Sequence, residues 1–102
     1  MIIRIFRARV RPGKQEEFER FMNEKVIPMV GKHKDIAEYA GRPYGSSSNE
    51  FTYVSVWKNL SDLRVFAGEG LGGIIDTTRR IALLEETFLH HFELFHKGRC
   101  NK

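Results

Sequence analysis

Three side chains in the second half of the chain are of types that can handle a proton beside an aromatic molecule. Tyr53 and Trp57 lie four residues apart in EFTYVSVW, and His91 precedes Glu93 by two residues. Alternate residues of a strand share a face at about 6.5 Å, so a Glu93 carboxylate can hold the His91 imidazole in one tautomer. His91 is therefore a candidate general base, Tyr53 a candidate hydrogen-bond donor and Trp57 a candidate pocket wall.

Each of these residues also has a purely structural interpretation. Trp57 can fill the core at a strand end, and Tyr53 can pack in an interface. Glu93 can form ion pairs with Arg7 and Arg9 across neighbouring strands. The four histidines and the single cysteine show no metal-ligand spacing, so we expect no metal site.

The elements that must position these residues follow the order strand, helix, strand, strand, helix, strand. Alternation of apolar residues predicts strands over 2–10, 36–44, 50–57 and 88–96. Helical periodicity predicts helices over 14–30 and 74–86, with a short helix at 61–67 capped by Asn59 or Ser61. Pro28 predicts a kink or an end in the first helix, whose apolar stripe is expected to contain Phe18, Phe21, Met22 and Met29.

The glycines of GEGLGG, residues 68–73, match the spacing of a dinucleotide-binding loop. In that fold the first glycine follows a strand directly, whereas Gly68 follows the helical stretch SDLRVFA. A glycine that caps a short helix explains the pattern better. We therefore expect no nucleotide, flavin or other cofactor.

Length and composition set the broad class. The chain has 102 residues, 41% of them hydrophobic and 29% charged, with a net charge of +4. These values predict one globular domain over residues 1–98 with a tail at 99–102. No apolar run is long enough to span a membrane and no signal sequence is visible, so we expect a cytoplasmic protein with no membrane partner.

The predicted sheet is apolar on both faces, although two helices can cover only one of them. Val54 and Val56 alternate with Phe51, Tyr53 and Trp57 along the third strand. An uncovered face of this kind exposes on the order of several hundred Å² of apolar surface, which is typical of an interaction site. We expect a second copy of the chain to cover it, sheet against sheet.

Two segments of the chain resemble the antibiotic biosynthesis monooxygenase (ABM) superfamily. They are RVRPGKQEEFERF at residues 9–21 and FTYVSVWKNLSDLRVF at residues 51–66. The resemblance implies an α+β, ferredoxin-like βαββαβ fold with a four-stranded antiparallel sheet and helices on one face. It further implies that the sheets of two subunits pair into a dimeric α+β barrel, with a ligand cavity between sheet and helices in each.

The same resemblance bears on the site residues. In the aromatic-polyketide oxygenase branch an Asn precedes the Val-Trp tryptophan by four residues; here Trp57 matches, and Tyr53 takes the Asn position. Arg79 or Arg80 is a counterpart of a helix arginine in that branch. The candidate substrate-binding residues are Phe66, Arg79, Arg7 and Glu93.

The haem-degrading branch of the superfamily fits less well. It carries an Asn, a Trp and a His at places that hold Arg7, Phe66 and Asp76 in this sequence. The resemblance therefore argues against haem degradation.

These observations predict a cofactor-independent monooxygenase that acts on a small aromatic, phenolic or quinol-type substrate. A small-molecule-binding dimeric barrel without enzymatic activity is the main alternative. A second alternative is an RNA-recognition motif, which has the same element order and stacks bases on strand-three aromatics such as Phe51 and Tyr53. Asn49 and Glu50 at the entry to that strand argue against nucleic acid, because an acidic residue there repels phosphate.

Overall fold

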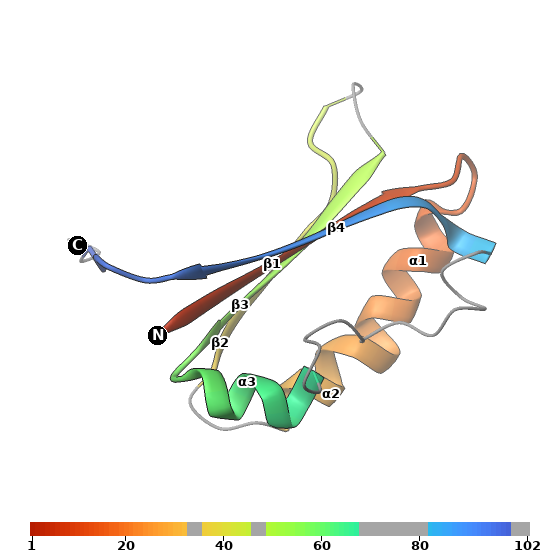
Figure 1. Ribbon diagram of the computed structural model, residues 1–102. Coiled ribbons are helices and arrows are strands. Elements are labelled where there is room, and N and C mark those ends of the chain that lie inside the picture. Colours follow the sequence, from red (N-terminus) through yellow and green to blue (C-terminus); the bar gives the residue numbers. More distant parts are fainter. Residues whose placement is uncertain (33–35, 46–48, 68–81, 99–102) are drawn as a thin grey trace, which may run out of the picture.

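A computed structural model describes residues 1–32, 36–45, 49–67 and 82–98 as one antiparallel sheet with helices on a single face (Figure 1). The sheet has the order β2-β3-β1-β4. Its strands are β1 (Ile2–Val10), β2 (Ala37–Gly41), β3 (Glu50–Trp57) and β4 (Leu84–Glu93). The helical segments are α1 (Gln15–Phe21), the π-helical η1 (Met22–Val26), α2 (Ile27–Gly31) and α3 (Leu60–Ala67). The predicted α+β, ferredoxin-like fold is confirmed.

The central strand β1 pairs with β3 on one side and with β4 on the other. Phe6 lies opposite Tyr53 of β3 and opposite Leu89 of β4. Even-numbered residues of β1 therefore share the helix-covered face with odd-numbered residues of β3 and β4. The alternation predicted from the sequence is confirmed for these strands.

The first helix runs past Pro28 without ending there. The irregularity expected near this proline takes the form of η1, in which the Ile27 N–H donates to the Met22 carbonyl, an i→i+5 bond. Such π-helical turns adapt a helix to a residue that cannot donate. Helical structure continues to Gly31.

The buried stripe of this helix differs in part from the expected one. Phe18, Met22, Val26 and Val30 are buried at four-residue spacing, which places them one above the other on one face. Met29 is 38% exposed, so its assignment to the stripe was wrong.

The predicted second helix, 74–86, falls mostly outside the described residues, and its C-terminal part is wrong. Leu84 already belongs to β4 and pairs with Val10 of β1. Arg11 N–H extends this pairing by donating to the Leu83 carbonyl at 2.8 Å. A register shift beside Val10 admits the extra residue Glu85, and this bulge was not visible in the sequence.

For α3, Asn59 is the cap, since its side-chain oxygen accepts the Asp62 N–H at 2.9 Å.

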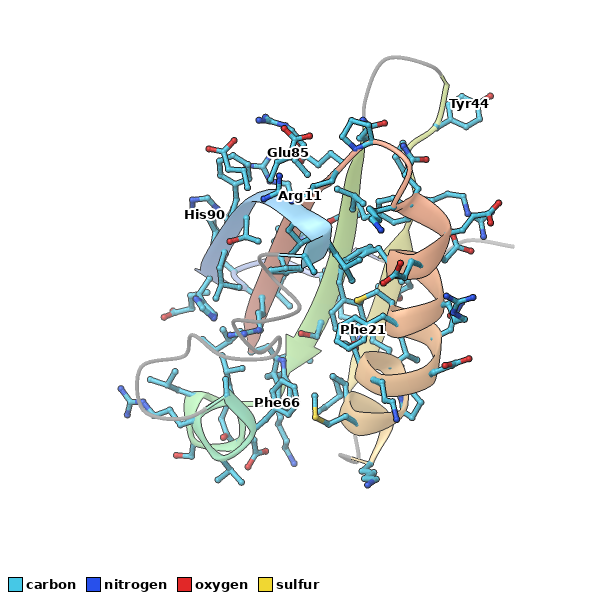
Figure 2. The ribbon with its side chains drawn as sticks, turned by 90° about the vertical axis from the view of Figure 1, so that its right-hand side faces the viewer. Arg11, Phe21, Tyr44, Phe66, Glu85 and His90 are labelled. Atoms are coloured by element: carbon cyan, nitrogen blue, oxygen red, sulfur yellow. The ribbon has the colours of Figure 1, made fainter. Side chains whose placement is uncertain are left out.

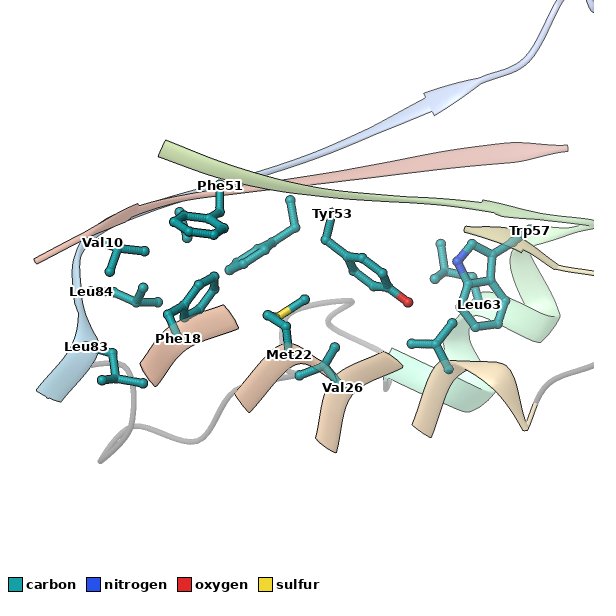
Figure 3. Packing of buried hydrophobic residues seen from close by; sticks show 13 residues of the cluster. Val10, Phe18, Met22, Val26, Phe51, Tyr53, Trp57, Leu63, Leu83 and Leu84 are labelled. Carbon is teal, nitrogen blue, oxygen red and sulfur yellow. The ribbon is translucent and has the colours of Figure 1, made fainter. Parts of the chain in front are cut away.

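The core lies between the sheet and the helices (Figure 3). It combines strand residues of β1, β3 and β4 with Leu63 of α3 and with the buried stripe of the continuous helix α1–η1–α2, called the long helix below. Phe18 packs edge-on against Phe51, with ring centroids 5.2 Å apart. Within the described residues, no helix is long and apolar enough to cross a membrane.

None of the helices that the structure describes covers the opposite face of the sheet (Figure 1). Ile5 of β1 lies beside Val54 of β3, and Val54 lies beside Tyr39 of β2, which is 67% exposed. Phe92 of β4 is 49% exposed on the same face, and His90 points away from the helices (Figure 2). An apolar strip therefore crosses all four strands.

Candidate ligand cavity

A cavity of about 270 Å³ lies between strands β2 and β3 and the long helix. Its walls are mainly apolar, and its polar residues are concentrated on α1, η1 and the end of β2. A dry cavity of about 150 Å³ can hold benzene, so this one has room for a compound of two fused rings. The lining residues are Phe6, Phe18, Glu19, Met22, Asn23, Ile27, Ala40, Gly41, Arg42, Phe51, Thr52 and Tyr53.

Tyr53 contributes both a ring and a hydroxyl to this part of the molecule. The side chain is 3% exposed, and its hydroxyl donates to Glu38 Oε2 at 2.5 Å. Glu38 reaches it from β2, where it lies opposite Ser55, on the helix-covered face. Burial, and next the hydrogen bond to the Glu38 carboxylate, raise the pKa of Tyr53. Tyr53 is therefore a neutral phenol whose proton already points at a carboxylate.

A bidentate ion pair joins the two sides of the cavity at its polar end. Arg42, just after β2, donates from Nε to Glu19 Oε1 at 3.0 Å and from Nη2 to Glu19 Oε2 at 2.8 Å. The Arg42 side chain is 72% exposed and that of Glu19 is 37% exposed. Both residues also line an outer hollow over α1, so the pair lies where the cavity meets the surface.

Trp57 is placed in the core and does not line the cavity. Its side chain is fully buried, its Nε1–H donates to Ser55 Oγ at 2.9 Å, and its ring stacks on Phe66 with centroids 5.0 Å apart. Figure 3 shows Trp57 beside Leu63 of α3. Of the two interpretations of Trp57, this geometry favours the structural one. Phe66, predicted as a substrate contact, holds Trp57 against α3.

His91 lies on the helix-covered face, beside the buried Arg4 of β1. Arg4 Nη1 is 2.9 Å from His91 Nε2. Because arginine can only donate, the pair requires an unprotonated Nε2 and places the ring proton on Nδ1. The structure thus pairs His91 with Arg4, where the sequence predicted Glu93, which shares this face opposite Ile2. His91 can act as a base at Nε2 only after releasing Arg4.

We expect the pKa of His91 in the folded protein to lie below the ordinary value of 6.5. Burial lowers it most, and the positive charges of Arg4 and His90 lower it further. As the pH falls, His91 therefore becomes protonated in the unfolded chain before it does in the folded protein. Its contribution to the free energy of unfolding is complete above about pH 6.5 and is lost as the pH drops below that value. NMR titration of the His91 imidazole protons tests this. A His91 pKa at or above 6.5 would contradict the pairing.

Arg7 is on the opposite face of the sheet from the cavity, so the structure does not bring this predicted substrate contact to the candidate site. It pairs with Glu50 at 2.9 Å, and its guanidinium lies 4.7 Å from the centroid of the Phe88 ring. Arg9 pairs with Glu86 on the same face, so the suggested cluster of both arginines with Glu93 is wrong. The reason is the β1–β4 register, which places odd-numbered residues of β1 opposite even-numbered residues of β4.

Several other expectations fall on residues outside the described ranges. These are the contributions of Arg79, Arg80 and Asp76 and the glycine loop at 68–73. Among the described residues, no three His, Cys, Asp or Glu side chains lie close enough together to hold a metal ion. The RNA-recognition alternative needs Phe51 and Tyr53 on the uncovered face, and this is wrong, because both are buried under the helices.

The charged residues of the cavity region, Glu38, Glu19 and Arg42, were missed in the sequence. Glu38 shares the alternation of β2 with Ala40, so a carboxylate on the covered face could have been noticed. Glu19 and Arg42 carried no signal, because their pairing depends on how α1 crosses the end of β2.

Comparison with known proteins gives a likeness of structure without a likeness of sequence. No family model and no curated protein matches the chain. Solved structures do match. A NIPSNAP domain protein from Burkholderia xenovorans has a TM-score of 0.69 at 15% identity, with 100% of each chain covered. The fold is shared.

Two further structures connect the fold with the resemblance drawn from the sequence. A candidate antibiotic biosynthesis monooxygenase from Bacteroides thetaiotaomicron matches with a TM-score of 0.69 at 12% identity, covering 99% of this chain and 95% of that one. A MhuD mutant, solved with two manganese protoporphyrin IX molecules per active site, matches with a TM-score of 0.71 at 14% identity, covering 98% and 100%. The chain has the fold of the ABM and NIPSNAP proteins, and the ABM-type fold is the one that its sequence indicated.

Proposed function

We propose that the cavity binds a small aromatic, phenolic or quinol-type molecule and that the protein oxidises it with molecular oxygen and no bound cofactor. The observation that carries this proposal is an apolar cavity with Tyr53 in its wall, hydrogen-bonded to Glu38. The apolar walls suit a flat ring, and a few polar groups suit an oriented hydroxyl. The shared ABM-type fold supports the class of reaction.

The proton chemistry follows from the direction of the hydrogen bond. Because the Tyr53 proton points at Glu38, a lone pair of the Tyr53 oxygen is available to accept a substrate O–H. The substrate passes its proton to the Tyr53 oxygen while Tyr53 passes its own proton to Glu38. The substrate becomes an anion, Tyr53 stays a neutral phenol and Glu38 becomes a protonated carboxyl group. Tyr53 relays the proton and Glu38 is its final acceptor.

Deprotonation makes an electron-rich substrate able to reduce oxygen directly. For 1-naphthol, a phenol of two fused rings, one O₂ oxidises the deprotonated substrate to 1,4-naphthoquinone; one oxygen atom enters the product as the new carbonyl oxygen and the other leaves as water. This four-electron change uses all four electrons that O₂ can accept, so no external reductant is needed. The protein contributes a dry site and a proton acceptor.

The proposed assembly is a homodimer formed through the uncovered face of the sheet. Its apolar strip, centred on Ile5 and Val54, is a contiguous apolar surface of the kind that marks interaction sites. Flanking ion pairs, Arg7–Glu50 and Arg9–Glu86, give this face a polar border. A second copy supplies a surface of the same character, as a two-fold interface requires.

Oxygen consumption with a panel of hydroquinones and naphthols tests the activity. We expect Tyr53→Phe and Glu38→Gln each to slow turnover by roughly 10², the usual scale for a positioned acid–base group. Tyr44→Phe is the matched control, because Tyr44 is fully exposed on the β2–β3 hairpin (Figure 2). His91→Ala distinguishes the relay from a histidine base, and we expect it to retain turnover within a few-fold.

Two results would contradict the oxygenase proposal in different ways. If the wild type binds the panel in the cavity but consumes no oxygen, the protein is a binder without this activity. If neither Tyr53→Phe nor Glu38→Gln slows an active wild type, the relay is wrong although the reaction class is right.

A further inference from the structure

We infer that Arg42 is a carboxylate-selecting residue at the mouth of the cavity, and that the ligand carries an acidic group which replaces Glu19 there. The ligand class is then an aromatic acid, with its rings in the cavity and its carboxylate at the surface. This inference rests on the proposed binding function and adds the charge of the ligand to it.

The first support is the geometry of the Glu19–Arg42 pair. Two parallel N–H···O bonds, at 3.0 and 2.8 Å, show that the Arg42 fork already accommodates a carboxylate in the bidentate arrangement. A ligand carboxylate can take over both bonds without moving the backbone. Glu19 then returns to water, to which it is already partly exposed.

The second support is the location of the pair. Glu19 and Arg42 line both the inner cavity and the outer hollow, so a molecule that enters the cavity from this hollow passes beside them. Phe18, Met22 and Phe51 form apolar wall on the inner side. A compound that fills this apolar space therefore places a group on its outer edge close to Arg42.

The third support is that Glu19 competes with the ligand carboxylate for Arg42, which makes the site selective. Glu19 already forms both hydrogen bonds with Arg42, so a small free anion gains little from replacing one carboxylate by another. An aromatic acid gains the burial of its rings in addition, at about 25 cal/mol per Å² of apolar surface. The pair thus favours anions that have an apolar body over simple anions.

Titration calorimetry with two isosteric probes, naphthalene-2-carboxylate and naphthalene-2-carboxamide, tests the inference on the full chain. Glu19→Gln should tighten binding of the carboxylate about five-fold, because the competitor loses its charge, and Arg42→Gln should weaken it about five-fold. Affinity for the carboxamide should stay within two-fold in both variants. Added salt should weaken only the carboxylate.

Glu17→Gln is the matched control, since it removes the same charge from the same helix at a residue that lies near Lys14 instead of Arg42. It should leave both affinities unchanged. If the carboxamide binds and the carboxylate does not respond to Glu19→Gln or Arg42→Gln, this inference is wrong and the cavity remains a binding site. If neither probe binds the wild type, the proposed binding function fails and this inference fails with it.

Discussion

Light scattering at micromolar concentration should give twice the 11.9 kDa chain mass, and Val54→Lys should reduce it to the mass of one chain. Val54 lies between Ile5 and Tyr39 in the middle of the uncovered face. A lysine there would bury an unpaired ammonium group, and two-fold symmetry would bury it twice. The dissociation constant should therefore rise by about 10²–10³-fold.

Val65→Lys is the control for this experiment. Val65 is on α3, away from the sheet face, and is 80% exposed, so the same substitution there should leave the dimer intact. Circular dichroism should show both variants folded. A wild type that remains monomeric at tens of micromolar would contradict the dimer and would leave the apolar strip to another partner.

Trp57→Ala should lower the free energy of unfolding by about 3–5 kcal/mol, the usual cost of deleting a large buried aromatic side chain. Trp57 is fully buried, stacks on Phe66 and donates to Ser55. Its loss removes the contacts that attach α3 to the end of β3. Urea denaturation monitored by circular dichroism measures the change.

The milder Trp57→Phe separates stability from binding. It keeps an aromatic ring in the core, so the protein should remain folded with reduced stability. Affinity for naphthalene-2-carboxamide should be unchanged, because Trp57 does not line the cavity. A loss of affinity in a folded Trp57→Phe variant would restore Trp57 as a pocket residue.

Local patterns in the sequence were sufficient to predict the sheet. Alternation predicted the strand over 2–10, and the structure places Phe6, Ala8 and Val10 on the buried face of β1 with Arg7 and Arg9 on the other. Period-two patterning records which residues share a face, whatever the strand pairs with. The cap at Asn59 was predictable for a similar reason, since it depends only on the next three residues.

The candidate site was predicted less well because it depends on contacts between distant segments. Tyr53 was identified, but its partner Glu38 is 15 residues away across the β2–β3 hairpin. His91 was identified as well, yet its partner Arg4 is 87 residues away. Arg7 was grouped with Glu93 because the β1–β4 register, which places Arg7 opposite Phe88 and Glu93 opposite Ile2, was not known in advance. Spacing within one strand cannot supply that information.

The most direct test of the central claim is a titration of the isotope-labelled protein with 2-naphthol, followed residue by residue in ¹H–¹⁵N NMR spectra. Binding in the cavity should shift the amide signals of Asn23, Gly41 and Thr52 most strongly and in a saturable way, because these residues line it. Amides of Ile5 and Val54, at the centre of the uncovered face, should move little. The largest shifts at Ile5 and Val54, or no saturable shift at Asn23, Gly41 and Thr52, would contradict the account.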